Sequence, residues 1–493
     1  MRRALLLALS LAAITCAEFV IFPGHTYLQG STQLYVPMLE RLDAPGYLSR
    51  DLVATHPNLT YTIYDEVTLF LHEAGRLDFE TALTAQQLVF RAAAIIGVYL
   101  LVRSAGFGSL WALLISALVN AGAFLPGPDA HLVNPEPVPS AFAFALCLLA
   151  IGCLASEKPL LCALAGGLAF LYDPPIAAVV WIVALIAFLA DRHVRRLLRP
   201  ALTIFLIFIL LLANLAQLQP GVAESEPLFS RIPSDVAAIL RARTRSAWVT
   251  SWASHEIWIY LFILICGLWA VARIWPSLNR QLRWLLLLPS LLGILSVPVS
   301  AWVLSQFGWW LIPRIKPARW LLFTVALSLV ACGIAGIQAT QLRRKLEAGA
   351  WFCFIIAVLV ITRVTAPPPQ TLSHKQAIIS LGRWAESNTW GSSMFVFPDA
   401  GRDLYPGVFR AESRRALWVD WMSGAQGDYS ATIARTWNER WHRDMTHVQT
   451  LQTLPIDYFV LKRSRRLLRI QPVFANRDFV VYDSRDLESI TTR

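Results

Sequence analysis

The chain has 493 residues, of which 56% are hydrophobic and only 15% are charged. A soluble globular protein carries about 25% charged residues, so this composition excludes a purely soluble protein and places most of the chain in lipid. The net charge is +11, but Lys and Arg cluster between hydrophobic segments and no basic, aromatic-rich domain is present, so we expect no nucleic-acid partner.

Hydrophobic segments dominate the first three quarters of the chain. A helix that crosses a bilayer needs about 20 mostly apolar residues, and we identify about eleven segments of this kind. The fifth is short and is separated from the sixth by Tyr172-Asp173-Pro174-Pro175, where a helix must break and where Asp173 could cap the next helix. The segments are residues 4–22, 84–103, 107–125, 139–155, 159–172, 175–191, 201–217, 256–274, 284–305, 319–339 and 350–364.

The distribution of basic residues predicts the orientation of these spans. If residues 4–22 form an uncleaved anchor with the N-terminus inside, most short basic loops fall on the cytoplasmic side, as the positive-inside rule expects. The first outer loop, residues 23–80, is rich in Asp and Glu and then lies outside. An odd number of spans places the C-terminus outside as well.

The composition changes to that of a soluble domain after Ala366-Pro-Pro-Pro. Helices are expected at 373–387 and 428–445, and short buried strands at 393–398, 416–420, 458–462 and 479–483. The predicted fold class is therefore mostly α. A polytopic transmembrane helical bundle spans residues 1–366, and a small extracytoplasmic α/β domain spans residues 367–493.

Three carboxylates of the first outer loop are candidates for catalysis. Asp51 ends the stretch Tyr-Leu-Ser-Arg-Asp, and Asp65 and Glu66 lie on a segment amphipathic enough for a helix at the membrane surface. One carboxylate could act as a general base, and a second could hold a divalent cation, Mg²⁺ or Mn²⁺. The alternative is that these acids are solvated or cap helices.

Two other loops that are predicted to lie outside contain basic residues, although the positive-inside rule places such residues on the cytoplasmic side. The arginine fork is well shaped for a phosphate, although such cations can also reach lipid headgroups. The candidates for binding a phosphate are Arg245, Arg314, Lys316 and Arg319.

Several kinds of chemistry have no support in the sequence. No Walker loop, nucleophile elbow or dinucleotide fingerprint is present, so we expect neither ATP use nor hydrolase chemistry. His25 and the other outer histidines lack the spacing of zinc ligands. The seven cysteines all fall in hydrophobic segments and form no disulfide or zinc pattern.

Five short stretches carry a resemblance to a known group of membrane enzymes. They are Gln33-Leu-Tyr-Val-Pro37, the run from Asp43 to Asp51, Pro135-Glu136-Pro-Val-Pro139, Pro317-Ala-Arg319 and Val419-Asp-Trp421. The layout resembles bacterial polytopic proteins of the GT-C glycosyltransferase superfamily, which includes protein mannosyltransferase-like and aminoarabinose transferase-like enzymes. The chain departs from that pattern at Ser31, where relatives carry an Asp.

This resemblance implies a function. It implies a membrane glycosyltransferase of the bacterial inner membrane, which moves a sugar from a polyprenyl-phosphate donor to an acceptor on the outer face. An acid of the first outer loop, here Asp51, would act in catalysis, and Arg319 would bind the donor phosphate. His25, Gln33 and Glu136 complete the substrate-binding candidates. A transporter or flippase of lipid-linked intermediates and a non-catalytic envelope-assembly scaffold remain the alternatives.

Overall fold

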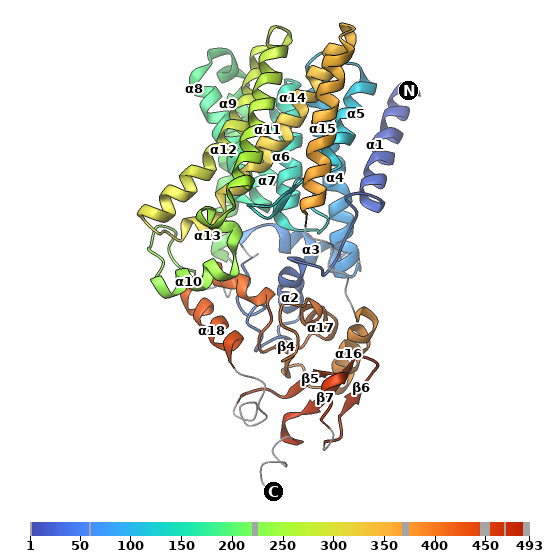
Figure 1. Cartoon of the computed structure of the whole chain (residues 1–493), viewed down its shortest axis with the longest axis vertical. Helices are drawn as coiled ribbons and strands as arrows, with labels where there is room; N and C mark the ends of the chain where they lie inside the picture. The colour runs from blue at the N-terminus through green and yellow to red at the C-terminus, as the bar shows by residue number, and fades with distance from the viewer. Residues whose placement is uncertain are drawn as a thin grey trace.

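The computed structural model describes residues 2–58, 61–218, 225–366, 374–443, 454–467 and 470–486. Apolar helices form a bundle at one end of the molecule, and a small domain lies at the other (Figure 1). In the described part of the chain, eleven helices make up this bundle: α1 Arg2–Val20, α4 Phe79–Ser104, α5 Ser109–Asn120, α6 Pro139–Ala155, α7 Pro159–Tyr172, α8 Pro174–Ala190, α9 Arg192–Leu218, α11 Ser254–Ile274, α12 Arg280–Gln306, α14 Leu321–Gln341 and α15 Lys345–Thr365.

Each predicted span corresponds to one of these helices. Among the described residues, six helices are long and apolar enough to cross a membrane, and five apolar helices are shorter. The break between α7 and α8 lies where the sequence predicts it, and the Asp173 side chain caps α8 by accepting a hydrogen bond from the Ile176 amide at 3.1 Å. The chain is thus a multi-pass membrane protein with a mostly helical fold.

The centre of the bundle is α14, which is apolar around its whole circumference and buried from Leu321 to Ile337. A helix without a polar face must be covered on all sides. Glycines permit the closest approach between two other helices: a Cβ on Gly152 of α6 would lie 2.2 Å from the carbonyl oxygen of Gly97 on α4. By contrast, α9 exposes Leu206 and Leu210, as expected of a helix that faces lipid.

Short elements fill the space between the bundle and the C-terminal domain, at what we call the domain end of the bundle (Figure 1). The first loop forms α2 (Thr32–Asp43) and α3 (Tyr64–Glu73), and later loops form α10 (Ser234–Arg243), α13 (Leu311–Ile315) and the 3-10 turn η5 (Pro317–Trp320). The third span is shorter than predicted. It ends at Asn120, because Phe124–Leu125 (β1) pairs with Ala130–His131 (β2) in an antiparallel hairpin.

The C-terminal domain is a five-stranded sheet with helices. Its elements are α16 Lys375–Asn388, β3 Met394–Val396, α17 Tyr405–Ser413, β4 Ala416–Leu417, the 3-10 helix η6 Met422–Asp428, α18 Ala431–His442, β5 Tyr458–Lys462, the 3-10 turn η7 Arg463–Arg465, β6 Phe474–Ala475 and β7 Phe479–Asp483. The strand order is β4-β3-β5-β7-β6. The first three strands are parallel, and β7 runs antiparallel to β5 and β6.

Successive side chains of β3 point to opposite faces of the sheet and enter two different cores. Phe395 of β3 packs into the core that holds Phe409 of α17, whereas its neighbours Met394 and Val396 join a second core with Trp437 of α18. The predicted strands and helices of this domain are all present, with ends that differ by a few residues, whereas α17 and β6 were not predicted. The expected boundary between residues 366 and 367 lies at the edge of a segment outside the described residues.

Candidate functional site

A cavity of 390 Å³ opens at the domain end of the bundle. The loop before α2, the loop before α6, η5 and the end of α15 all contribute to its wall. The polar and charged lining residues are Thr26, Gln29, Ser31, Tyr35, Asp129, His131, Asn134, Glu136, Ser140, Arg319 and Arg363. Segments far apart in the sequence therefore bring carboxylates and guanidinium groups to one hollow.

Glu136 is the most firmly held of these side chains. Its carboxylate accepts hydrogen bonds from the Gln29 amide at 2.9 Å, the Thr32 amide at 3.2 Å and the Thr32 hydroxyl at 2.8 Å. The carboxylate thus sits at the N-terminus of α2, where unpaired amides favour an anion. Burial raises the pKa of Glu136 above its ordinary value, while the hydrogen bonds from Thr32 and Gln29 oppose the shift.

The close fit of Glu136 explains the glycine in front of α2. A Cβ on Gly30 would lie 2.9 Å from a carboxylate oxygen of Glu136. Ser31, at the position where the resemblance expects an Asp, is exposed and lines the cavity. The Glu136 carboxylate, which comes from the loop before α6 and not from the first loop, therefore lies beside this position.

Arg91 of α4, which the sequence analysis missed, fixes the loop that carries Glu136. Its guanidinium donates to the carbonyl oxygens of Glu18, Gly24 and Asn134 at 3.0, 2.6 and 3.1 Å. Gln87, one helical turn earlier, donates to the carbonyls of Asn134 and Pro135. The end of α1, the start of the first loop and the loop before α6 are thereby joined to one rigid helix.

Arg319 provides a positive charge at the wall of the cavity. Its Nε atom is buried and has no hydrogen-bond acceptor among the described residues. The next residue anchors the turn, since Trp320 donates its indole N–H to the carbonyl of Pro175 at 2.8 Å. Asp173 and Tyr35 both lie within electrostatic reach of Arg319. Arg363, a second cation of the wall, lies over the Phe22 ring at 5.1 Å.

Asp51 lies elsewhere, at the contact between the first loop and the C-terminal domain. Its side chain is fully buried and accepts hydrogen bonds from the amides of Val53, Ala54 and Leu417 at 2.9, 3.1 and 3.0 Å. Arg410 of α17 lies 3.6 Å from it. Asp51 does not line the cavity and is enclosed between the first loop and the C-terminal domain, so the geometry places it as a structural residue.

Asp65 and Glu66 also lie outside the cavity wall. Asp65 is buried at the start of α3, where burial and a hydrogen bond with Glu66 raise its pKa to about 9. Both carboxyl groups belong to the first turn of α3. Neither Asp51 nor Asp65 lines the cavity that Arg319 lines.

The remaining polar candidates of the first loop connect parts of the protein to one another. His25 Nδ1–H donates a hydrogen bond to Gln87 Oε1 at 2.6 Å, and burial lowers the pKa of His25. The Gln33 amide donates to the carbonyls of Leu28 and Leu404 at 2.8 and 2.9 Å and is fully buried. Gln33 is thus a link to the C-terminal domain and does not reach the cavity.

Three of the four basic candidates are engaged with protein groups. Arg245 pairs with Glu256 at 2.9 Å, and Lys316 pairs with Asp428 at 2.8 Å. Arg314 donates to the carbonyl of Glu226 at 2.7 Å. Only Arg319 among the four lines the cavity. Within the described residues, no group of three His, Cys, Asp or Glu side chains lies close enough to hold a metal ion.

Comparisons with known proteins add little to this geometry. No family model matches the chain, and no curated protein matches its sequence. One solved structure to which it is similar is the crystal structure of ArnT from Cupriavidus metallidurans in the apo state, with 13% identity, 97% of each chain covered and a TM-score of 0.39. At this identity and TM-score, the likeness is not evidence for a shared activity or a shared site.

Proposed function

We propose that the chain is a membrane glycosyltransferase of the GT-C type, which transfers a sugar from a polyprenyl-phosphate donor to an acceptor on the outer face of the membrane. The observation that carries this proposal is the cavity at the domain end of the bundle, which both Glu136 and Arg319 line. A carboxylate and a guanidinium are the two groups that such a transfer needs.

The roles follow from the chemistry of the two groups. The acceptor hydroxyl or amine attacks the anomeric carbon of the donor sugar, and the bond from that carbon to the phosphate oxygen breaks. Glu136 takes the proton that the acceptor loses, and a raised pKa makes it a better base. Polyprenyl phosphate leaves with the electron pair of the broken bond, and the guanidinium of Arg319 stabilises its charge.

Apolar residues beside the cavity support a lipid-linked donor. The wall residues Arg363 and Ala366 lie near the end of α15 and directly after it, and the neighbouring Val364 is 78% exposed. Val20 and Ile21, which precede the wall residue Pro23, are 76% and 78% exposed. A donor could therefore place its phosphate in the cavity while its tail stays in the lipid around α1 and α15.

The proposal is tested by transfer in reconstituted vesicles. Polyprenyl-phosphate donors carrying radiolabelled pentoses or hexoses are supplied with a lipid extract as acceptor. We expect Glu136→Gln and Arg319→Met to lower transfer at least about 100-fold, the cost of losing a proton acceptor or a charge-stabilising donor. Asp235→Asn and Arg245→Met are the matched controls, since both residues lie outside the cavity wall.

Thermal unfolding of each variant separates loss of chemistry from loss of structure. Glu136→Gln keeps one acceptor oxygen and replaces the other by an NH₂ group, so we expect a loss of about 1 to 3 kcal/mol in a chain that still folds. If both cavity variants transferred sugar at the rate of the parent chain, the cavity would not be the site of transfer. Absence of transfer by the parent chain with every donor would contradict the proposed function itself.

A further inference from the structure

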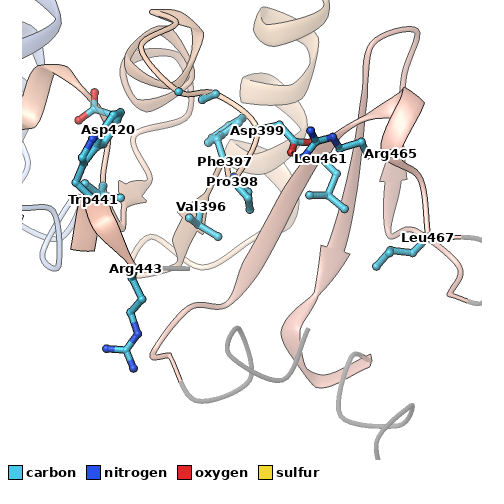
Figure 2. Close-up of a pocket in the computed structure, with 13 residues that line it drawn as sticks. Val396, Phe397, Pro398, Asp399, Asp420, Trp441, Arg443, Leu461, Arg465 and Leu467 are labelled. Atoms are coloured by element: carbon cyan, nitrogen blue, oxygen red, sulfur yellow. Dashed lines mark hydrogen bonds and ion pairs between the residues drawn. The ribbon is translucent and has the colours of Figure 1, made fainter. Parts of the chain in front are cut away.

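A second cavity, of 460 Å³, lies in the C-terminal domain (Figure 2). Its floor is the segment that follows β3, from Phe397 to Gly401, and its walls come from the segments that follow β4 and β5 and from the end of α18. None of these residues lines the first cavity. A site here would be independent of the proposed transferase site.

The topology of the sheet gives a reason for a ligand at this place. From β3 the chain continues through α17 to β4, which lies on one side of β3 in the sheet. The neighbour of β3 on the other side is β5, and from β5 the chain continues away from β3 to β6 and β7. Adjacent parallel strands whose connections diverge leave a crevice outside their carboxyl ends, and ligands of open α/β sheets bind in such crevices. Lining residues from the segments after β3 and β5 place this cavity there.

Polar groups of both kinds face the cavity. Asp399 accepts a hydrogen bond from Arg465 at 2.6 Å and from the Lys462 amide at 3.2 Å. On the other side, Asp420 accepts from the Ser423 amide at 3.0 Å and lies 3.4 Å from Arg410. The charged lining residues are two acids, Asp399 and Asp420, and two arginines, Arg443 and Arg465, so their charges balance. Figure 2 shows Phe397 between the two acids.

An aromatic wall completes the lining. Trp441 of α18 stacks on Trp437 with ring centroids 5.5 Å apart and an interplanar angle of 15°. Trp421 packs against the same pair at 5.3 Å from Trp441. These contacts hold the Trp441 indole rigidly at the edge of the cavity, beside Asp420 (Figure 2).

We propose that this cavity binds a short, uncharged saccharide. Sugar hydroxyls both donate and accept hydrogen bonds, so they match carboxylate acceptors and guanidinium donors on one wall. The apolar face of a sugar ring suits an indole surface. The balanced charge of the lining disfavours a phosphate or pyrophosphate, and the volume lies within the range of small-molecule sites, about 300 to 1,000 Å³.

The test uses the full chain in phospholipid nanodiscs, because alkyl glycoside detergents would offer a competing sugar. The labelled nanodiscs are applied to a printed array of bacterial glycans, and the saccharide of the strongest spot is then titrated by calorimetry. We expect Trp441→Ala and Asp399→Asn to weaken binding about tenfold or more, which corresponds to the loss of one stacking or hydrogen-bonding contact.

Two variants of the same domain serve as matched controls. Trp390 is 84% exposed and Asp403 is half-exposed beside Lys462, and neither lines the cavity. Trp390→Ala and Asp403→Asn should bind within about twofold of the parent chain. Binding of no glycan, equal loss in all four variants, or displacement of the saccharide by inorganic pyrophosphate would each overturn the proposal. Because Arg319→Met leaves this cavity intact, saccharide binding by that variant separates this inference from the proposed function.

Discussion

Replacing Arg410 by methionine should loosen the contact between the first loop and the C-terminal domain. The Arg410 side chain is 1% exposed and lies 3.6 Å from Asp51 and 3.4 Å from Asp420, which are equally buried. It also donates to the carbonyl of Gln33 at 2.8 Å. Arg410→Met would leave two carboxylates in the interior without their counter-charge.

The expected loss of stability in Arg410→Met depends on the hydrogen-bond donors that Asp51 and Asp420 keep. Removing one member of a buried ion pair costs about 3 to 5 kcal/mol. Asp51 keeps three amide donors, and Asp420 keeps the amide of Ser423. These bonds continue to stabilise both charges, so we expect the lower end of the range, about 3 kcal/mol, which corresponds to roughly a 150-fold change in an equilibrium constant.

Hydrogen exchange measures this change at the contact itself. The amides of Val53, Ala54 and Leu417 donate to Asp51, so their peptides should exchange about 100-fold faster in Arg410→Met. The control is Arg435→Met, because Arg435 and its partner Asp235 are both about half-exposed and such pairs contribute about 1 kcal/mol or less. Unchanged exchange of these peptides in Arg410→Met would refute the assignment of Arg410 and Asp51 to a structural contact.

Two further predictions concern stability. The pKa of Asp65 is raised to about 9 from 3.8, so the folded chain binds the extra proton and the free energy of unfolding falls as the pH rises between these values. Asp65→Asn should therefore raise the unfolding temperature at pH 8 more than at pH 5, and an equal rise at both would contradict this. A Cβ on Gly407 would lie 2.0 Å from the Gln33 Oε1 atom. Gly407→Ala should cost about 1 to 3 kcal/mol in thermal unfolding, whereas Gly349→Ala, which meets no atom within 4 Å, should be neutral or stabilising.

The sequence was sufficient for the bundle because apolar run length and proline position are local signals. Pro174 and Pro175 end one predicted span and begin the next, and the structure has α7 and α8 on either side of Asp173. In the C-terminal domain, alternating apolar residues placed the principal strands. The two-residue strand β6 was missed because Phe474–Ala475 is too short to show a pattern.

The site was harder to predict because its contacts join distant parts of the chain. Asp51 is buried by a bond to the Leu417 amide, 366 residues later, and nothing near Asp51 in the sequence announces that partner. Glu136 reaches the Thr32 amide, 104 residues earlier, so the sequence showed an isolated acid between prolines. Arg319 was identified as a phosphate ligand by its place in a basic outer loop, and its position on the cavity wall is compatible with that prediction.

Photoaffinity labelling tests most directly whether the cavity at the domain end holds the donor lipid. The reagent is a polyprenyl phosphate with a diazirine next to the phosphate, applied to the full chain in nanodiscs and followed by peptide mapping. The account predicts labels within residues 29–35, 129–141 and 316–322, which diminish in Arg319→Met and persist in Arg245→Met. Labels spread over the lipid-facing residues of α9, and unchanged by Arg319→Met, would contradict it.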